Sequence, residues 1–480
     1  MFKIPKTDSN TELIAELKRG LTVTPQVFSP IPGAKQLSFP MFSEDGKSLS
    51  IPFAYGFQKG YITKSDLLKR IKSIEDNATK IEVEFSSQYP LRDYQELGLR
   101  KTLSSLKSNC GALLALQTGA GKSALGCAVI AKLKMKTLII VHKRFLLEQW
   151  METIKKFLGD CQVSIIQGEK VDLSGQIVIG MLQSIVFKDY DKSIFSSFSV
   201  VILDEVHHAP ANRFSEAITQ KLDNIYIVGL SATPKRQDGI KVEWLVSPIT
   251  FKFERKFDNS PIVHIVDYED SKPIDFVFTR CGTISTPNMI NNLVLDEDRN
   301  NLIVDSLQKI YEQDDAELRF TLVVSDRRNH LEHLYDLIQE NEILKKYRTG
   351  FQVGNMKKKV FDESRENSQI ILGTFQLLSE GWDSPRMNTL FLVTPKSNIQ
   401  QVNGRILRVQ HSINPIIVDF NDSSIYCFQP AFKKRERFFK SQNYPIIYGN
   451  TLDLDKEIDT EEVEDQPKSV EGFNFNECLL

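Results

Sequence analysis

A short glycine-bearing segment, residues 116–123, has the residue types that bind phosphate. It reads Leu-Gln-Thr-Gly-Ala-Gly-Lys-Ser, follows an apolar run at 111–116 and precedes a helix-like stretch at 123–132. Glycines let backbone N–H groups turn toward an anion, and the N-terminus of the next helix adds a positive field. Lys122 is placed to reach the β- and γ-phosphates of a nucleotide, and the Ser123 hydroxyl to ligate Mg²⁺. A glycine is usual where Leu116 stands, so the loop is a shortened form; an ordinary glycine-rich turn is the alternative.

A pair of carboxylates, Asp204 and Glu205, follows the aliphatic run at 199–203. A carboxylate at the end of a buried strand, opposite a phosphate loop, is where a second Mg²⁺ anchor belongs, so we expect Asp204 to hold the ion through water. We expect Glu205 to orient and deprotonate an attacking water. His207 and His208 come next, but neighbours in sequence point apart and no third ligand is suitably spaced, so they predict no metal site.

Short aliphatic runs separated by helical stretches must position these residues. From residue 90 they lie at 111–116, 137–141, 176–181, 199–203 and 224–230, and the pattern returns at 320–324, 350–353, 369–372, 389–393 and 415–419. Buried strands that alternate with helices indicate parallel sheets covered on both faces. The fold class is therefore α/β, with two similar parallel-sheet lobes, of which only the first carries a phosphate loop.

The ends of the chain differ from these lobes. Residues 1–86 predict a small α+β accessory domain, with helices at 11–18 and 64–76, a hairpin at Asp45-Gly46 and an exposed strand at 81–85. This domain either contacts nucleic acid or a partner, or covers the first lobe as a lid. Residues 87–255 form the first lobe, 256–295 a connector and 296–450 the second lobe. Residues 451–480 begin with a run rich in Asp and Glu and predict a disordered acidic tail.

Bulk composition sets further limits. A chain of 480 residues exceeds the ~250–300 residues at which single cores stop growing. The formal charge of −2 gives no global signature of nucleic-acid binding, although local patches decide the field at a site. The six cysteines form no C-x-x-C pair, no run approaches the ~18 apolar residues of a membrane span, and residues 1–8 contain no apolar signal region. We therefore expect a soluble intracellular protein without a membrane partner.

Five segments together resemble the motifs of superfamily 2 helicases. Residues 117–123, 204–208 and 231–234 are similar to motifs I, II and III, and residues 373–383 and 401–408 to motifs V and VI. The Asp-Glu-x-His box separates the chain from Asp-Glu-Ala-Asp RNA helicases. Residues 229–239 and 404–408 are most similar to the DNA-directed branch. That branch includes eukaryotic transcription/repair 3′–5′ helicases, phage branch-migration helicases and poxvirus-type transcript-release helicases; the short chain and residues 51–56 favour viral or phage members.

The resemblance implies a fold of two tandem RecA-like lobes and a set of nucleotide-site residues. Arg92 and Gln95 resemble the segment that reads adenine, although a simple helix start is the alternative. Arg405 and Arg408, on one face if helical, would act as arginine fingers, and Gln401 as a nucleotide sensor. Coupling of hydrolysis to lobe movement would use His207, Ser231 and Thr233, the last two of which could instead cap a turn. The cofactor-binding set is Arg92, Gln95, Gln117, Thr118, Gly119, Ala120, Gly121, Lys122, Ser123, Gly381 and Asp383.

Nucleic acid would cross the top of both lobes. The candidate contacts are polar residues at strand and helix ends, with ordinary surface polarity as the alternative: Lys143, Arg144, Gln183, Ser184, Ser325, Arg327 and Thr374. His330 and His333 lack the spacing of zinc ligands, so a solvated helix face is expected. Residues 432–440 mix rings and cations, for which we favour packing over base stacking.

The sequence thus predicts an enzyme that hydrolyses ATP with Mg²⁺ and moves along or unwinds nucleic acid. We expect single-stranded, forked or duplex DNA as partner, with RNA or a transcription complex as alternatives. A viral protein of this kind would act in the infected-cell cytoplasm or the virion, in transcript release or in DNA repair and recombination. A duplex translocase that separates no strands would have the same ATPase residues, and a non-motor subunit would bind ATP only as a switch. The oligomeric state stays open, and a monomer is compatible with the sequence.

Overall fold

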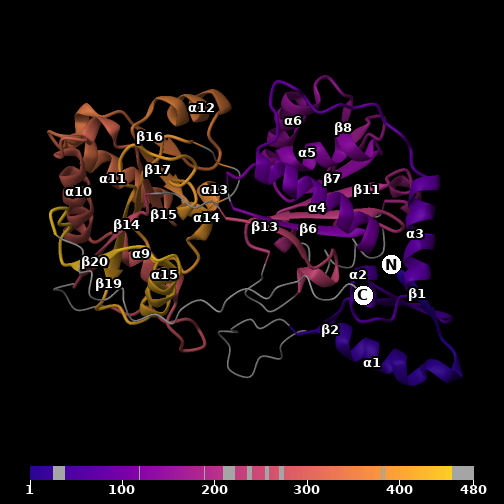
Figure 1. The fold of residues 1–480 in the computed structure, drawn as a ribbon. Coiled ribbons are helices and arrows are strands. Elements are labelled where there is room, and N and C mark those ends of the chain that lie inside the picture. The colour runs from indigo at the N-terminus through magenta and orange to yellow at the C-terminus, as the bar shows by residue number, and fades with distance from the viewer. Residues whose placement is uncertain are drawn as a thin grey trace.

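The chain folds into two parallel-sheet lobes and an N-terminal unit that packs on the first lobe (Figure 1). The structure, a computed structural model, describes residues 1–24, 38–117, 119–188, 190–208, 222–234, 241–254, 259–269, 275–379, 382 and 384–456. No helix among these residues has the length and apolar character needed to cross a membrane.

The first lobe is built on an eight-stranded sheet of order β13-β6-β12-β11-β7-β10-β8-β9. All neighbours are parallel except β9, which is antiparallel to β8. The strands are β6 (Gly111–Leu116), β7 (Thr137–Val141), β8 (Val163–Gln167), β9 (Lys170–Val171), β10 (Ile177–Met181), β11 (Val200–Asp204), β12 (Tyr226–Ser231) and β13 (Ile249–Phe253). The helices are α4 (Asp93–Asn109), α5 (Lys122–Leu133), α6 (Arg144–Leu158) and α7 (Leu182–Phe187).

Both faces of this sheet are buried, as its continuous aliphatic strands predict. Successive side chains of a strand point to opposite faces, so Leu114 joins the core under α4, α5 and α6, whereas Leu113 joins the core on the other face. That second core also contains Leu17 of α1 (Thr11–Leu21), Ile51 of β5 (Ser48–Ile51) and Tyr55 of α2 (Phe53–Gln58). The N-terminal unit therefore covers one face of the first lobe through a shared core.

The N-terminal unit has the α+β character that the sequence predicts. Its sheet has the order β1-β5-β4, with β1 (Phe2–Pro5) and β4 (Ser43–Glu44), and α3 (Lys64–Asp76) and the pair β2 (Thr22–Val23) and β3 (Phe39–Pro40) complete it. The predicted hairpin is present, because β4 and β5 pair antiparallel and the backbone N–H of Asp45 donates to the Ser48 carbonyl. The strand predicted at 81–85 is wrong: these residues belong to no strand, although Ile81 and Val83 are buried.

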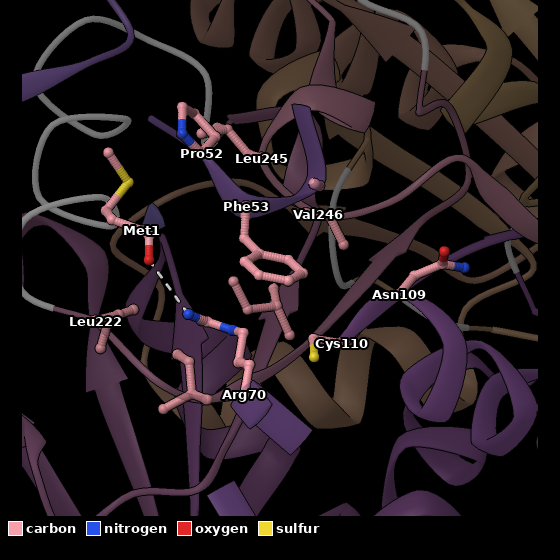
Figure 2. A pocket seen from close by; sticks show the side chains of 12 residues that line it. Met1, Pro52, Phe53, Arg70, Asn109, Cys110, Leu222, Leu245 and Val246 are labelled. Carbon is pink, nitrogen blue, oxygen red and sulfur yellow. Dashed lines mark hydrogen bonds between the residues drawn. The ribbon is translucent and has the colours of Figure 1, made fainter. Parts of the chain in front are cut away.

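A small cavity lies between this unit and the first lobe (Figure 2). Phe53, Arg70 and Cys110 line it, and the Arg70 guanidinium carbon lies 4.6 Å from the centroid of the Phe53 ring. Its volume of about 30 Å³ is room for a water molecule and little more. The cavity therefore fits a packing joint better than a ligand site, and the covering alternative for residues 1–86 has direct structural support.

The second lobe has a seven-stranded sheet of order β16-β17-β15-β18-β19-β14-β20, all parallel. The strands are β14 (Ile262–Tyr268), β15 (Thr321–Ser325), β16 (Thr349–Gln352), β17 (Ile370–Thr374), β18 (Thr389–Leu392), β19 (Ile416–Asp422) and β20 (Ile446–Gly449). The helices are α9 (Thr286–Leu293), α10 (Glu297–Tyr311), α11 (Arg328–Glu340), α12 (Lys358–Asn367), α13 (Phe375–Ser379), α14 (Gln400–Asn403) and α15 (Gln429–Ser441). Helices α10 and α11 share a core with one face, and α13, α14 and α15 with the other.

The connector predicted at 256–295 needs correction. It contains β14, an interior strand that pairs with β19 and β20, so the second lobe begins before residue 296. The aliphatic run of this strand, Ile-Val-His-Ile-Val, is interrupted by His264 and is less regular than those of its neighbours. Most of the predicted acidic tail, residues 457–480, lies outside the described residues.

Candidate nucleotide site

The loop between β6 and α5 needs its glycines for two reasons. Gly119 and Gly121 have φ values of +81° and +77°, in the left-handed region that glycine tolerates best. A Cβ on Gly121 would also lie 2.3 Å from the Gln95 amide nitrogen. The loop closes through a hydrogen bond from the Ala120 N–H to the Gln117 carbonyl, at 3.0 Å. Thr118 lies outside the described residues.

Lys122 and Glu205 meet in the space beside this loop. Lys122 begins α5, at the positive end of the helix, and its Nζ lies 3.2 Å from Glu205 Oε1. Both side chains are mostly buried, with exposed fractions of 12% and 14%. The structure thus brings together the predicted phosphate-binding cation and the predicted general base, although 82 positions separate them in the sequence.

Two hydrogen bonds hold the Asp204 carboxylate at the end of β11. The backbone N–H of Glu205 donates to Oδ1 at 3.0 Å, and the indole N–H of Trp150 donates to Oδ2 at 2.8 Å. Glu205 has a φ of +46°, an uncommon value for a residue with a side chain and one that costs about 1–3 kcal/mol. Burial, and then the negative charge of Glu205, raise the pKa of Asp204, while Lys122 and the two donors oppose that rise.

The side chains beside the loop, Ser123 and Asp204, fit Mg²⁺ better than a transition metal. No group of three or more His, Cys, Asp or Glu side chains in the described part of the chain is arranged to hold a metal ion. Mg²⁺ needs no such cage, because it binds through one or two carboxylates together with substrate phosphates and water. Asp204 and the Ser123 hydroxyl, at the N-terminus of α5, are ligands of that kind.

The predicted coupling residues form a chain of contacts that reaches Glu205 through His207. His207 Nδ1 lies 3.0 Å from the Ser231 hydroxyl at the end of β12 and 3.5 Å from Glu205 Oε2. The backbone N–H of Thr233 also donates to Ser231 Oγ, at 3.1 Å, in the manner of a turn cap. Ser231 therefore caps its turn and also contacts His207 of the 204–208 segment, so the turn-cap and coupling interpretations of this residue are compatible.

Residues 92–95, which precede the first strand of the lobe, contact the phosphate loop through two side chains. Gln95 Oε1 accepts from the Arg92 backbone N–H at 2.9 Å, and its amide nitrogen donates to the Ala120 and Gly121 carbonyls at 3.3 and 3.4 Å. The Tyr94 hydroxyl donates to the Ala120 carbonyl at 3.1 Å. The predicted adenine reader thus lies against the phosphate loop, where its amide nitrogen is engaged while its amide oxygen binds the Arg92 backbone, and adenine contact stays a prediction.

The second lobe brings one arginine, not two, to the loop. The Arg408 side chain lies over Gly119, with its Cδ 2.6 Å from the position that a Cβ on Gly119 would take, and donates to the Trp382 carbonyl at 3.3 Å. Arg405 is 2% exposed, and its guanidinium donates to the Leu378 and Trp382 carbonyls inside the second lobe. The helical spacing assumed for the pair is wrong here because α14 ends at Asn403.

The structure says less about three other second-lobe residues that were predicted to act at the nucleotide site. Gln401, on α14, is partly exposed, and Gly381 and Asp383 lie outside the described residues.

The predicted nucleic-acid contacts have different degrees of exposure. Arg144 is exposed over 79% of its side chain, and Lys143 is the N-cap residue of the same helix, α6. Gln183 and Ser184 bind local backbone, through the His142 carbonyl and the Gly168 N–H. Thr374, at the end of β17, is partly exposed. These contacts stay predictions.

In the second lobe, Ser325 and Arg327 are held by their own lobe. Ser325 is fully buried and accepts from the Arg327 backbone N–H, and the Arg327 guanidinium donates to Asn291 and to the Pro287 carbonyl on α9. Neither group points outward without a partner, so phosphate contact by either side chain would require a local rearrangement.

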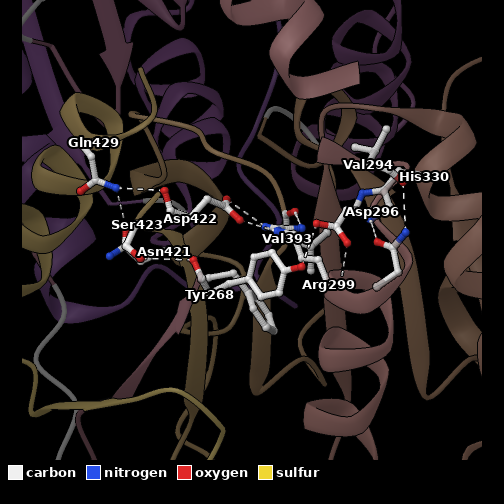
Figure 3. A network of polar contacts seen from close by, with 12 residues as sticks. Tyr268, Val294, Asp296, Arg299, His330, Val393, Asn421, Asp422, Ser423 and Gln429 are labelled. Atoms are coloured by element: carbon white, nitrogen blue, oxygen red, sulfur yellow. Dashed lines mark hydrogen bonds and ion pairs between the residues drawn. The ribbon is translucent and has the colours of Figure 1, made fainter. Parts of the chain in front are cut away.

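A buried polar network in the second lobe includes Arg299, Asp422 and His330 (Figure 3). His330 is 1% exposed and bridges the Ser325 hydroxyl, 3.0 Å from Nδ1, to the Asn300 amide oxygen, 2.9 Å from Nε2. Burial lowers the pKa of His330 to about 3. The prediction of a solvated face is therefore wrong for His330, whereas His333, 36% exposed, pairs with Glu297 at the surface.

Sequence reasoning also missed two buried ion pairs in this lobe. Arg299 binds Asp422 through two N–H donors, and Arg435 binds both oxygens of Asp419. Arg435 belongs to the 432–440 segment, where packing was favoured, and its burial together with Phe439 confirms that interpretation.

In the first lobe, the hydrogen bond from Trp150 to Asp204 was missed as well, because a tryptophan on the apolar face of a helix normally signals packing alone.

Comparisons with known proteins agree with this geometry. Residues 88–236 match the family model described as "Type III restriction enzyme, res subunit". The chain is 31% identical to "Putative ATP-dependent RNA helicase L396" of Acanthamoeba polyphaga mimivirus over 93% of its own length and 85% of the relative. It is 26% identical to the African swine fever virus protein "Putative ATP-dependent RNA helicase QP509L" over 75% of each chain.

Among solved structures, yeast Dbp5 bound to RNA and ADP BeF3 aligns with a TM-score of 0.52 at 12% identity, over 82% of this chain and 95% of that one. At this identity the likeness shows the fold alone, and it confirms the prediction of two tandem RecA-like lobes. The sequence similarity adds the enzyme class. The chain belongs to the superfamily 2 helicases, a family of enzymes that hydrolyse ATP.

Proposed function

We propose that this protein is an ATP-driven motor that moves along DNA and separates or remodels its strands. One observation carries the proposal: Lys122, Asp204 and Glu205 converge beside a glycine loop, and Arg408 of the other lobe lies over the same loop. A pocket to which both lobes contribute changes shape whenever the lobes move, so it can link hydrolysis to movement.

Each residue in this pocket has a role that its surroundings support. Lys122 and the backbone of the loop bind the β- and γ-phosphates, and Ser123 and Asp204 would hold Mg²⁺, which would supply positive charge to neutralise the phosphates. Lys122 exchanges Glu205 for phosphate as a nucleotide binds, because a triphosphate is the stronger partner for a cation at that helix end. That exchange releases Glu205 to accept a proton from the attacking water.

The second lobe supplies the charge that completes the site. Arg408 is positioned to stabilise the charge that develops on the γ-phosphate, as an arginine finger. Arg405 acts indirectly, since it ties the 404–408 turn to the Leu378 and Trp382 carbonyls and so fixes the direction in which Arg408 extends. His207 connects the hydrolysis site to Ser231 at the end of β12, and this contact would couple hydrolysis to lobe movement.

RNA is the second candidate substrate, and the comparisons favour it specifically. The mimivirus and African swine fever virus relatives are both named as RNA helicases. Our preference for DNA rests on the motif resemblance, in particular the Asp-Glu-x-His box and residues 229–239. A role in viral transcription, such as transcript release, or in DNA repair rests on the same motif resemblance.

The deciding experiment measures ATP hydrolysis with single-stranded DNA, duplex DNA, forked DNA and RNA at matched salt, because such affinities depend steeply on ionic strength. We expect DNA to stimulate hydrolysis and forked DNA to be unwound. Stimulation by RNA alone would reject DNA as the substrate. Triplex displacement without unwinding would identify a duplex translocase, and hydrolysis that no nucleic acid stimulates would contradict the motor itself.

A further inference from the structure

Trp150 connects three elements of the nucleotide site. It lies in the middle of α6, is 1% exposed, and directs its indole N–H to Asp204 at the end of β11. The opposite edge of the ring lies against α5, the helix that begins with Lys122. A Cβ on Gly126 of α5 would come within 2.9 Å of the indole, so a glycine is what lets the ring approach so closely.

We propose that Trp150 is a positioning residue for the Asp204 carboxylate, and that it sets how tightly the site holds Mg²⁺. The inference rests on the proposed role of Asp204 as the Mg²⁺ anchor. It goes beyond that role because it assigns a function to a residue on α6, outside the five helicase-like segments.

The geometry of the carboxylate carries the argument. Each oxygen has one fixed donor, the Glu205 backbone N–H on Oδ1 and the indole N–H on Oδ2. Two donors on different oxygens fix the rotation of the carboxylate plane and leave the remaining lone pairs available to an ion. Without the indole donor, only the backbone donor on Oδ1 restrains that plane.

The choice of side chain supports a role beyond packing. A phenylalanine or leucine would fill an apolar space against Gly126, Ile202 and Leu230 without a polar atom. A tryptophan in such a place needs a partner for its N–H, and the partner here is a charged group, which makes the stronger class of hydrogen bond. Partners of metal-binding side chains typically change metal affinity by about 10–100-fold when they are removed.

The test compares Trp150→Phe, which keeps the ring and removes the donor, with Trp244→Phe as a matched control. Trp244 also belongs to the first lobe, but it packs on Tyr55 of the N-terminal unit, with the ring centroids 5.2 Å apart. We expect Trp150→Phe to raise the Mg²⁺ concentration for half-maximal hydrolysis by about 10–100-fold and to recover at saturating Mg²⁺. Trp244→Phe should leave that concentration unchanged.

A second readout needs no hydrolysis. The chain has three tryptophans, so ¹⁵N labelling of the indoles gives three N–H resonances, and the one lost in Trp150→Phe is assigned to Trp150. We expect that resonance to move in Asp204→Asn and on addition of Mg²⁺ with ADP. This measurement stands even if Trp150→Phe folds poorly, because single-site variants of the other two tryptophans complete the assignment.

The outcomes distinguish an error in the positioning role of Trp150 from an error in the proposed role of Asp204 as the Mg²⁺ anchor. A wild-type Mg²⁺ requirement in Trp150→Phe, or a Trp150 resonance that Asp204→Asn leaves in place, would overturn the positioning role. Lower thermal stability with an unchanged Mg²⁺ requirement would mean that the ring only packs. If Asp204→Asn itself hydrolysed ATP with wild-type Mg²⁺ dependence, the proposed Mg²⁺ anchor would be the error.

Discussion

Acid should destabilise the second lobe through His330. The ring bridges Ser325 and Asn300 inside the lobe, and in this arrangement Nδ1 accepts from the serine while Nε2 donates to the amide oxygen. A neutral imidazole can do both, but a protonated one has no acceptor left. Burial, and next the positive charge of Arg299, lower the pKa of His330 from 6.5 to about 3. The folded lobe therefore keeps the ring neutral.

The direction and size of this pH effect on the free energy of unfolding follow from the pKa values of His330 in the folded and the unfolded chain. Because the folded pKa lies below the unfolded one, the stabilising contribution is complete above about pH 6.5 and is lost as the pH falls toward 3. At pH 5 the unfolded chain is almost fully protonated at this residue and the folded chain is not. With about 1.4 kcal/mol per pKa unit, the free energy of unfolding drops by about 2 kcal/mol between pH 7.5 and pH 5.

The measurement compares this protein with His330→Gln. The glutamine cannot be protonated, and other buried histidines, such as His264, whose pKa burial lowers to about 4, act equally in both proteins. Urea unfolding is followed by Trp382 fluorescence with Trp150 and Trp244 replaced by Phe, so that the signal reports on the second lobe. We expect the parent to lose about 2 kcal/mol more than the variant. Parallel pH profiles would refute a neutral buried His330.

Three further predictions concern the nucleotide site. Glu205→Gln should bind ATP but hydrolyse it at least ~10²-fold more slowly, and near wild-type turnover would remove Glu205 from the chemistry. Arg408→Ala should lower turnover by about 10³-fold or more at an unchanged melting temperature, as loss of an arginine finger does. Arg405→Ala should instead lower the melting temperature of the second lobe, because it removes buried donors from two carbonyls. Equal effects of the two variants on turnover and on melting temperature would contradict their separate roles. Gly121→Ala should weaken ATP binding, measured by titration calorimetry, because a Cβ there meets Gln95 at a φ of +77°, and wild-type affinity would show that the loop tolerates a side chain.

The sequence was most informative where chemistry and periodicity coincide. Strand positions such as 111–116 and 137–141 match β6 and β7 residue for residue, because continuous aliphatic runs between helices have few other folds available. The meeting of Lys122 with Glu205 follows from the same logic. Glu205 comes directly after β11, and Lys122 follows the short loop after β6; the carboxyl ends of these parallel strands share one edge of the sheet.

The failures share a physical cause: burial that local sequence does not display. His330 stands among charged residues on α11, and only the tertiary neighbours Ser325 and Asn300 make it an interior residue. Arg405 was assigned to a helix face by its spacing from Arg408, but the helix ends before it and its guanidinium turns inward. Strand β14 escaped notice because His264 interrupts its apolar run.

The position of β14 has a consequence for biosynthesis. Its two partners, β19 and β20, are among the last strands of the chain, whereas every strand of the first sheet precedes residue 254. The first lobe can therefore mature on the ribosome, but β14 must wait until some 180 further residues have been translated, which takes about 10–40 s at 5–20 residues per second. During that interval its edges are open to pairing with other chains, which is a route to aggregation.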